Sequence, residues 1–275
     1  MAHPAFKQLT REEYLALDPV EFRARFRERV HHSLEIRVYN VIGSGEPLAA
    51  GSTDIVESLI GIWRERKLPE DTADFRWAQR ILGFAKTLQA GGAVDLSPYA
   101  PRPISAEGLA AFEGIVKQRR SVRRWTDRRV SDEVIDKVLE AGSWAAHACN
   151  LQSIRYIVVR EENAPGLVPG NIAGAPVHIL ILQDERVYEA NTIMPIRNRL
   201  LDAGAAAQNI ALAAHAYGLG GVWLTHSDDM LEKLYDYFRL HERVKIVTYV
   251  DVGYPAQTPA PVDKLGLDET LLRRI

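Results

Sequence analysis

Apolar residues at helical spacing predict that roughly the first hundred residues of the chain are mostly helical. Phe22, Phe26 and Val30 recur every four residues, so they lie on one side of a helix. Further helices are predicted over residues 54–66 and 74–88, where the pattern is also helical. We expect these helices to pack their apolar sides together.

Glycine and proline interrupt the helical pattern near residue 100. Gly91 and Gly92 precede the run PYAPRP at residues 98–103, which holds three prolines in six residues. Such a run cannot continue a helix. We therefore predict a mainly helical N-terminal extension over residues 1–103 and a second domain over residues 104–275.

The rest of the chain alternates helices with strands. Helices are predicted over residues 105–118, from 131, over 198–217 and from 227, and strands over 154–159, 177–182, 221–225 and 244–252. The run VHILIL at 177–182 is almost continuously apolar, which is typical of a strand buried on both faces. This order predicts an α+β or α/β domain layered around one central sheet.

Composition narrows the class of protein. The chain is 47% hydrophobic and 25% charged, as in ordinary globular proteins. Its net charge of −2 argues against a nucleic-acid partner, because a phosphate backbone attracts a basic surface. Cys149 is the single cysteine, so we expect no disulfide and a reducing, cytoplasmic setting. No apolar run approaches the ~20 residues of a membrane-spanning helix.

The densest candidate for chemistry is the run RRSVRRW at residues 119–125. Guanidinium groups donate forked, charge-assisted hydrogen bonds and a serine hydroxyl adds a short donor, which suits a phosphate and a planar polar group. If the run is extended, Arg119, Ser121 and Arg123 share one face and the other arginines share the opposite face. The alternative is a basic helix end that complements the helix dipole.

This run resembles the opening signature of the nitroreductase family of FMN-dependent oxidoreductases, in which R-R-S-x-R-x-[FW] begins the flavin site. Further similar segments follow in the family's order. They are VSDEVI at 130–135, AAHACNLQ at 145–152, GAPV at 174–177, DAGAAAQN at 202–209, GLG at 218–220 and GYP at 253–255, followed by Lys264. The resemblance covers about residues 105–275 and does not extend to the N-terminal extension.

The resemblance implies an α+β, three-layer fold with a central mixed β-sheet flanked by helices. It also implies a homodimer with FMN at the subunit interface. Arg119, Ser121 and Lys264 would hold the FMN phosphate, with Arg120 beside them. Arg123 would face the pyrimidine end of the flavin, where its charge stabilises the reduced anion.

The resemblance also assigns residues to the flavin ring. His147 and Asn150 would reach the flavin of the partner subunit, while Leu224 and Thr225 lie where the family supplies a donor to flavin N5. His147 departs from the family pattern, which has a serine there. A histidine at this place donates a proton to the substrate, binds its anion, or only replaces the serine's hydrogen bond. We take His147 and Thr225 as the candidate catalytic groups.

The implied function is an FMN-dependent oxidoreductase that passes hydride from NADH or NADPH through flavin N5 to a small nitroaromatic or quinone-like acceptor. One alternative is a specialised member, such as a reductive dehalogenase, a ring dehydrogenase or a flavin-fragmenting enzyme, with the N-terminal helices as a lid or substrate wall. Others are a low-turnover flavin-binding regulatory protein and a helical interaction protein. We expect no metal site, because no histidine, cysteine or acidic set has ligand spacing.

Overall fold

The computed structural model describes residues 9–168, 174–192 and 196–275. The helices in these ranges are α1 (Arg11–Ala16), α2 (Pro19–Arg29), α3 (Ile36–Ser44), α4 (Asp54–Glu65), α5 (Ala73–Gln89), α6 (Ala106–Gln118), α7 (Asp132–Ser143), α8 (Ile196–Ala216), α9 (Asp228–Phe238) and α10 (Leu267–Thr270). The strands are β1 (Ile154–Arg160), β2 (Val177–Asp184), β3 (Gly220–Leu224) and β4 (Val244–Gly253). Short 3-10 or π-helical segments are η1 (Val30–Glu35), η2 (Ser97–Tyr99), η3 (Ala148–Asn150) and η4 (Glu185–Ala190). None of the described helices is both long and apolar enough to cross a membrane.

The strands form one sheet in the order β1-β2-β4-β3, and each neighbouring pair is antiparallel. The prediction of a mixed sheet is therefore wrong for the described strands. β2 and β3 do run in the same direction, with α8 as the crossover between them, but β4 lies between them and runs the opposite way. Among the described residues, parallel pairing is seen as an isolated bridge between Ser121 and Gly221.

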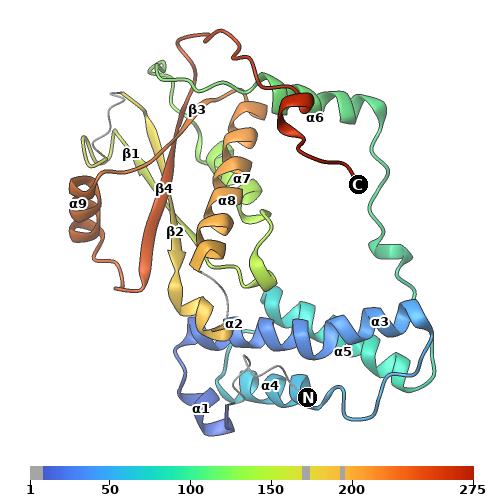
Figure 1. Cartoon of the computed structure of the whole chain (residues 1–275). Coiled ribbons are helices and arrows are strands. Elements are labelled where there is room, and N and C mark those ends of the chain that lie inside the picture. Colours follow the sequence, from blue (N-terminus) through green and yellow to red (C-terminus); the bar gives the residue numbers. More distant parts are fainter. Residues whose placement is uncertain (1–8, 169–173, 193–195) are drawn as a thin grey trace.

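Helices cover both faces of the sheet (Figure 1), with α7 and α8 on one face and α9 on the other. On β2, Val177, Ile179 and Ile181 pack in the cluster with α7 and α8. The alternate residues Leu180 and Leu182 pack in the cluster with α9. The continuous apolar run thus belongs to a strand buried on both faces, as predicted.

The N-terminal helices pack around an aromatic core, and we call α1 to α5 with η1 the helical unit. The ring centroid of Trp63 lies 4.8 Å from that of Phe26 and 5.5 Å from that of Phe75. Phe22, Phe26 and Val30, the predicted apolar stripe, are all 0% exposed. The prediction of a helical N-terminal region is confirmed.

The helix that carries this stripe does not stay regular. It changes to a π-helix at η1 before it continues as α3. A π-helical turn holds more residues than an α-helical turn, so it rotates the faces that follow. Leu34 and Val38 nevertheless remain 0% exposed, which shows that the change of register keeps the apolar side inward.

The helical unit packs against the sheet domain through α2 (Figure 1). Ala24 on α2 shares a buried cluster with Leu151, Val187 and Tyr188. The chain between α5 and α6 instead forms a mostly exposed connection on the side away from the sheet, at the right of Figure 1. The division into domains at residue 103 stays a prediction.

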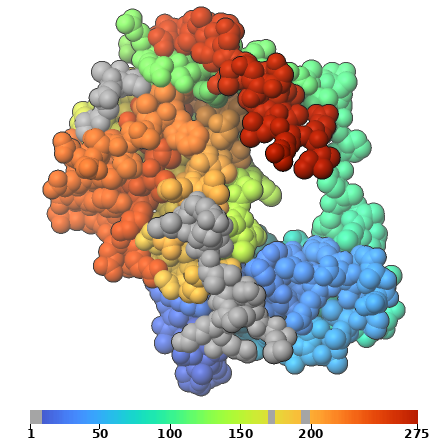
Figure 2. Space-filling view, viewed as in Figure 1, coloured from blue at the N-terminus to red at the C-terminus, as the bar shows by residue number. Residues whose placement is uncertain are grey.

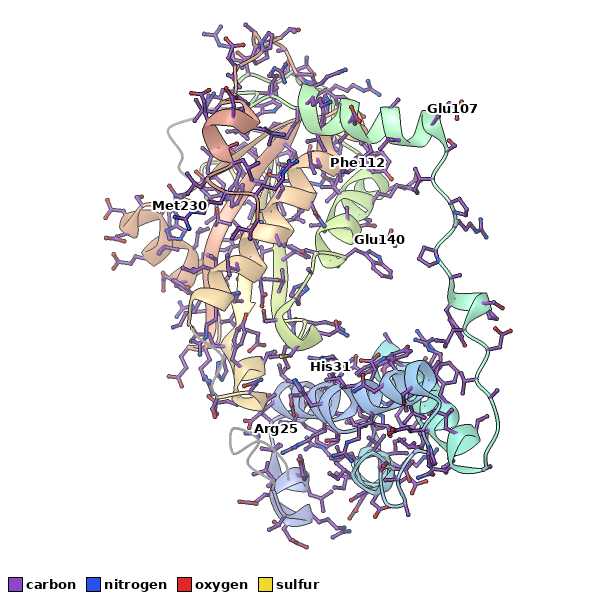
Figure 3. The ribbon with its side chains drawn as sticks, turned by 45° about the vertical axis from the view of Figure 1, so that its right-hand side comes forward. Arg25, His31, Glu107, Phe112, Glu140 and Met230 are labelled. Carbon is purple, nitrogen blue, oxygen red and sulfur yellow. The ribbon has the colours of Figure 1, made fainter. Side chains whose placement is uncertain are left out.

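A wide opening separates the helical unit from α6 and the C-terminal tail (Figure 2). Phe112 and Glu140 point toward this opening from α6 and α7, and His31 borders it from the helical unit (Figure 3). The side chain of Phe112 is 60% exposed. In the described chain, no residue of α6 is buried.

Candidate functional site

The arginine-rich run lies across one end of the sheet. The backbone N–H of Val122 donates to the carbonyl of Gly221 at 3.1 Å, and the indole of Trp125 donates to the carbonyl of Gly220 at 3.0 Å. A side chain at Gly220 would place its Cβ 2.7 Å from Val122, so only glycine allows this close approach. The run is held beside the start of β3 and the end of β4, where Trp125 bridges to Pro255.

The arginines of this run have no acidic partner in the part of the chain that the structure describes. Arg119 and Ser121 are half-buried, and Arg123 is exposed. Arg120 folds back instead, and its Nη1 donates to the carbonyls of Lys117 at 2.8 Å and Arg119 at 3.0 Å. The helix-end interpretation therefore holds for Arg120, while the other guanidiniums remain available to an anion.

His215, in the last turn of α8, lies close to the guanidiniums of Arg119 and Arg120. Burial lowers the pKa of His215, and the nearby charges of Arg119 and Arg120 act in the same direction. The C-terminal end of α8 therefore lies against the arginine run. Lys264, the last predicted phosphate ligand, is exposed on the tail that follows β4.

His147 and Asn150 lie at the opposite end of the sheet, just before β1. β2 spans that distance from Val177 to Asp184, which is roughly 23 Å at 3.3 Å per residue. Within one chain the structure does not bring His147 and Asn150 to the arginine run. The prediction that they serve the partner's flavin requires such a separation, and it stays a prediction.

The backbone around η3 is held in an unusual conformation. Cys149 and Asn150 have φ values of 51° and 50°, in the left-handed region that non-glycine residues seldom adopt. Asp202 on α8 supports this turn, because its Oδ1 accepts from the backbone N–H of Ala148 at 3.1 Å. Its Oδ2 accepts from the hydroxyl of Tyr188 at 2.8 Å. Asp202 is a positioning residue that the sequence analysis quoted within a motif without assigning it a role.

The imidazole of His147 is oriented by the main chain. Its Nδ1 donates to the carbonyl of Ala145 at 2.7 Å. Its Nε2 is buried and has no hydrogen-bond partner among the described residues. A buried polar atom without a partner is costly, so the geometry leaves Nε2 ready for a ligand.

Leu224 and Thr225 lie at the end of β3, nearer the middle of the sheet. Leu224 pairs with Tyr249 on β4, and its carbonyl accepts a 2.5 Å hydrogen bond from the hydroxyl of Thr248. The indole of Trp223 donates to the same hydroxyl at 2.7 Å. Thr225 follows the strand and is exposed, so its hydroxyl remains accessible.

A cavity of about 350 Å³ lies where the helical unit meets η3 and β1. Its lining residues come from both parts of the molecule: Val20, Arg23, Arg27, Asp74, Ser143, His147, Gln152, Ile154 and Arg155. Of these residues, His147 alone was predicted as a site residue; Arg23 and Arg27 lie opposite the apolar stripe of their helix, where the sequence favours a solvated face over an anion site, yet Arg27 is 5% exposed. The sequence does not link these arginines to Gln152, Ile154 and Arg155, because the two segments are far apart along the chain. No group of histidine, cysteine or acidic residues in the described ranges has the geometry of a metal site.

Comparison with known proteins identifies the family. The model of the nitroreductase family matches residues 116–170 and 169–254. A protein of Methanothermobacter thermautotrophicus named "Putative NADH dehydrogenase/NAD(P)H nitroreductase" is 32% identical over 167 residues, which cover 58% of this chain and 85% of that protein. FMN reductase (NAD(P)H) of Bacillus subtilis is 25% identical, over 56% of this chain and 72% of the relative.

A solved structure agrees with this assignment. The crystal structure of a "putative nitroreductase in complex with FMN" from Desulfovibrio desulfuricans has a TM-score of 0.53 and 33% identity, covering 64% of this chain and 99% of that one. The chain therefore belongs to the nitroreductase family of oxidoreductases. The family model begins at residue 116, so the helical unit lies outside it.

Proposed function

We propose that the protein is a homodimeric, FMN-dependent oxidoreductase that moves electrons from NADH or NADPH to a small organic acceptor. The observation that carries this proposal is the arginine run of residues 119–125, fixed beside β3 without an acidic partner in the described chain. FMN carries both a phosphate and a planar polar ring, which are the groups that such a run binds. The family match and the FMN named for the Desulfovibrio desulfuricans structure support the same cofactor.

The residues of the run fit the two ends of FMN. Arg119, Ser121 and Lys264 would bind the phosphate, and the charge of Arg120 would add to the potential there. Arg123 would bind the pyrimidine end of the ring, where a positive charge favours the reduced form. When bound, FMN would supply the hydride-transfer chemistry that no amino-acid side chain provides.

A second copy of the chain would complete the site. The imidazole of His147 and the amide of Asn150 lie at the far end of the sheet from the arginines, so a partner related by two-fold symmetry could bring them to the flavin. The exposed apolar side chains around the opening support this arrangement, since such patches mark interfaces. They include Leu109, Phe112 and Val116 on α6, which are 54%, 60% and 45% exposed. The partner would fill the opening seen in Figure 2.

His147 and Thr225 would act on the reacting groups. Nε2 of His147, which has no partner in the described chain, would hold a proton for the acceptor or bind its negative charge. The exposed hydroxyl of Thr225 and the backbone at Leu224 would donate a hydrogen bond to the flavin edge. These roles concern the positions of protons and hydrogen bonds.

Nitroaromatic and quinone-like molecules are the first acceptors to test, because a relative carries a nitroreductase name. A specialised reaction, such as reductive dehalogenation, ring dehydrogenation or flavin fragmentation, is a second candidate. The observation that favours it is the cavity beside His147, one wall of which comes from the helical unit. An enzyme that reduces many different acceptors would not need a cavity wall supplied by additional helices.

The test begins with the absorption spectrum of the protein purified with added FMN. We expect a bound flavin band that bleaches rapidly when NADPH or NADH is mixed anaerobically in a stopped-flow instrument. Reoxidation by 4-nitrobenzoate or a quinone should then restore the band. A colourless protein would contradict flavin binding, and a flavin band that neither nicotinamide reduces would favour a regulatory flavoprotein.

A further inference from the structure

We propose that the cavity between the helical unit and η3 binds the carboxylate of an aromatic acid substrate. This inference rests on the proposed oxidoreductase function and names the class of its acceptor. The cavity, at about 350 Å³, falls at the small end of the usual range of ligand sites. It suits a single substituted ring better than a dinucleotide.

Three guanidinium groups and a single carboxylate line the cavity. Nε of Arg23 and Nη1 of Arg27 donate to the same oxygen of Asp74, at 2.8 and 2.9 Å. Arg155 forms no salt bridge within the described residues, and its Nη1 donates to the carbonyls of Gln152 and Ile154. The wall therefore carries an excess of positive charge, which a bound anion would offset.

Other properties of these arginines agree with an anion site. Arg27 is only 5% exposed, and its Nε is buried without a hydrogen-bond partner in the described chain. Partial burial lowers the pKa of Arg155; the charge of Asp184 opposes this effect, while the nearby guanidiniums of Arg186 and Arg23 add to it. An arginine keeps its proton in such surroundings, so the positive charges persist side by side.

The remaining lining residues define the rest of the ligand. The apolar side chains of Val20 and Ile154 would contact a ring. His147 connects the cavity to the reaction, because it lines the cavity and is the residue that we place beside the partner's flavin. A carboxylate held by Arg23 and Arg155 would thus orient the ring toward that flavin.

The helical unit supplies the residues that would give this enzyme its specificity for an acidic acceptor. Arg23, Arg27 and Asp74 come from α2 and α5, which lie outside the segment matched by the nitroreductase family model. The family fold alone would leave His147 and Arg155 without this wall. The N-terminal extension therefore selects the acceptor by adding charge, while the sheet domain carries the cofactor.

The test compares two acceptors that differ in one charge, 4-nitrobenzoate and nitrobenzene, with the FMN-loaded enzyme. Arg155→Gln and Arg23→Gln should each raise the KM for 4-nitrobenzoate about tenfold or more, since each removes a charged donor. The KM for nitrobenzene should stay unchanged. Arg76→Gln on α5 removes the same charge from an exposed position outside the cavity, and it should leave both values unchanged.

Calorimetric titration with benzoate, which accepts no electrons, measures binding separately from turnover. Wild-type protein should bind benzoate, and Arg155→Gln should bind it about tenfold more weakly. Equal benzoate affinity in both proteins would overturn the inference. So would a higher KM for NADPH in place of 4-nitrobenzoate, because the arginines would then serve the nicotinamide phosphates. If NADPH fails to reduce the flavin, the proposed function fails, while the benzoate titration still reports on the cavity.

Discussion

Nη2 of Arg27 on α2 donates a 2.6 Å hydrogen bond to the carbonyl of Leu151, a residue 124 positions further along the chain. Nη1 of the same guanidinium donates to Asp74 on α5 at 2.9 Å. One buried side chain therefore joins two helices of the helical unit to the turn that carries His147. The geometry of the cavity depends on this connection.

Arg27→Met should lower the free energy of unfolding by about 2–4 kcal/mol, because it leaves the buried carbonyl of Leu151 without this donor and removes one of the two guanidiniums that bind the buried carboxylate of Asp74. Urea unfolding followed by circular dichroism would measure the loss. Arg23→Met is the matched control, since Arg23 binds the same carboxylate but its side chain is 41% exposed. It should cost less than about 1 kcal/mol. Equal unfolding midpoints for the two variants would contradict the role assigned to Arg27.

A buried pair in the sheet predicts how stability depends on pH. Nδ1 of His178 on β2 lies 2.6 Å from Oδ1 of Asp251, its register partner on β4, and Glu161 lies 3.4 Å from Nε2. Burial acts to lower the pKa of His178, but the hydrogen bond and charge of Asp251 outweigh it, and the pKa is raised above the ordinary 6.5. Folding therefore favours the protonated imidazole.

The stabilisation from His178 should be fully present below pH 6.5 and should be lost as the pH rises through the higher pKa of the folded state. We expect the difference in unfolding free energy between wild type and His178→Gln to be largest near pH 6 and to shrink toward pH 9. Urea titrations across this range provide the measurement. A difference that stays constant with pH would show that the imidazole contributes only packing.

Substitutions at two adjacent glycines test whether FMN binding depends on the position of the arginine run. Gly220→Ala places a Cβ 2.7 Å from Val122, so it should displace residues 119–125 and weaken FMN retention roughly tenfold or more. Gly221→Ala brings its Cβ no closer than 3.4 Å to the carbonyl of Asp251, an ordinary contact, and should keep the flavin. Fluorescence titration with FMN distinguishes them. Equal affinities would indicate that the flavin does not depend on the run.

Much of the fold could be predicted from local patterns. α7 and α9 begin where the sequence predicts them, because Ser131 caps α7 by accepting from the backbone of Val134 and Ser227 caps α9 in the same way. The alternation along β2 follows from its burial on both faces. Such features depend on neighbours close in sequence, which is why a single sequence reveals them.

Other features depend on contacts that the sequence does not display. The antiparallel order follows from the insertion of β4 between β2 and β3, which periodicity does not encode. The cavity could not be predicted, because Arg27 and Leu151 meet only after folding. The π-helical turn at η1 was also missed, since the apolar stripe continues through it. The roles assigned to site residues from the family resemblance remain predictions about the enzyme with FMN bound.

Arg123→Ala should weaken FMN binding by about tenfold to a hundredfold and make the flavin harder to reduce, because a positive charge beside the reduced ring is lost. Arg124→Ala is the control. Arg124 is exposed, lies on the other face of the run, and uses its carbonyl to accept from the backbone of Ala256. Cofactor content and midpoint potential should change only in the first variant. An unchanged potential in Arg123→Ala would count against the proposed orientation of FMN.

Heterodimers test whether each flavin is shared between two chains. With Arg123→Ala on one chain and His147→Ala on the other, both changes fall in the same site if His147 serves the partner's flavin, and the second site remains intact. About half of the wild-type turnover should then survive. With both changes on one chain beside a wild-type partner, each site carries one change, and turnover should fall well below half. The heterodimers can be isolated with two different affinity tags. The reverse order of activities would place His147 at the flavin of its own chain, against the separation of His147 from the arginine run along β2.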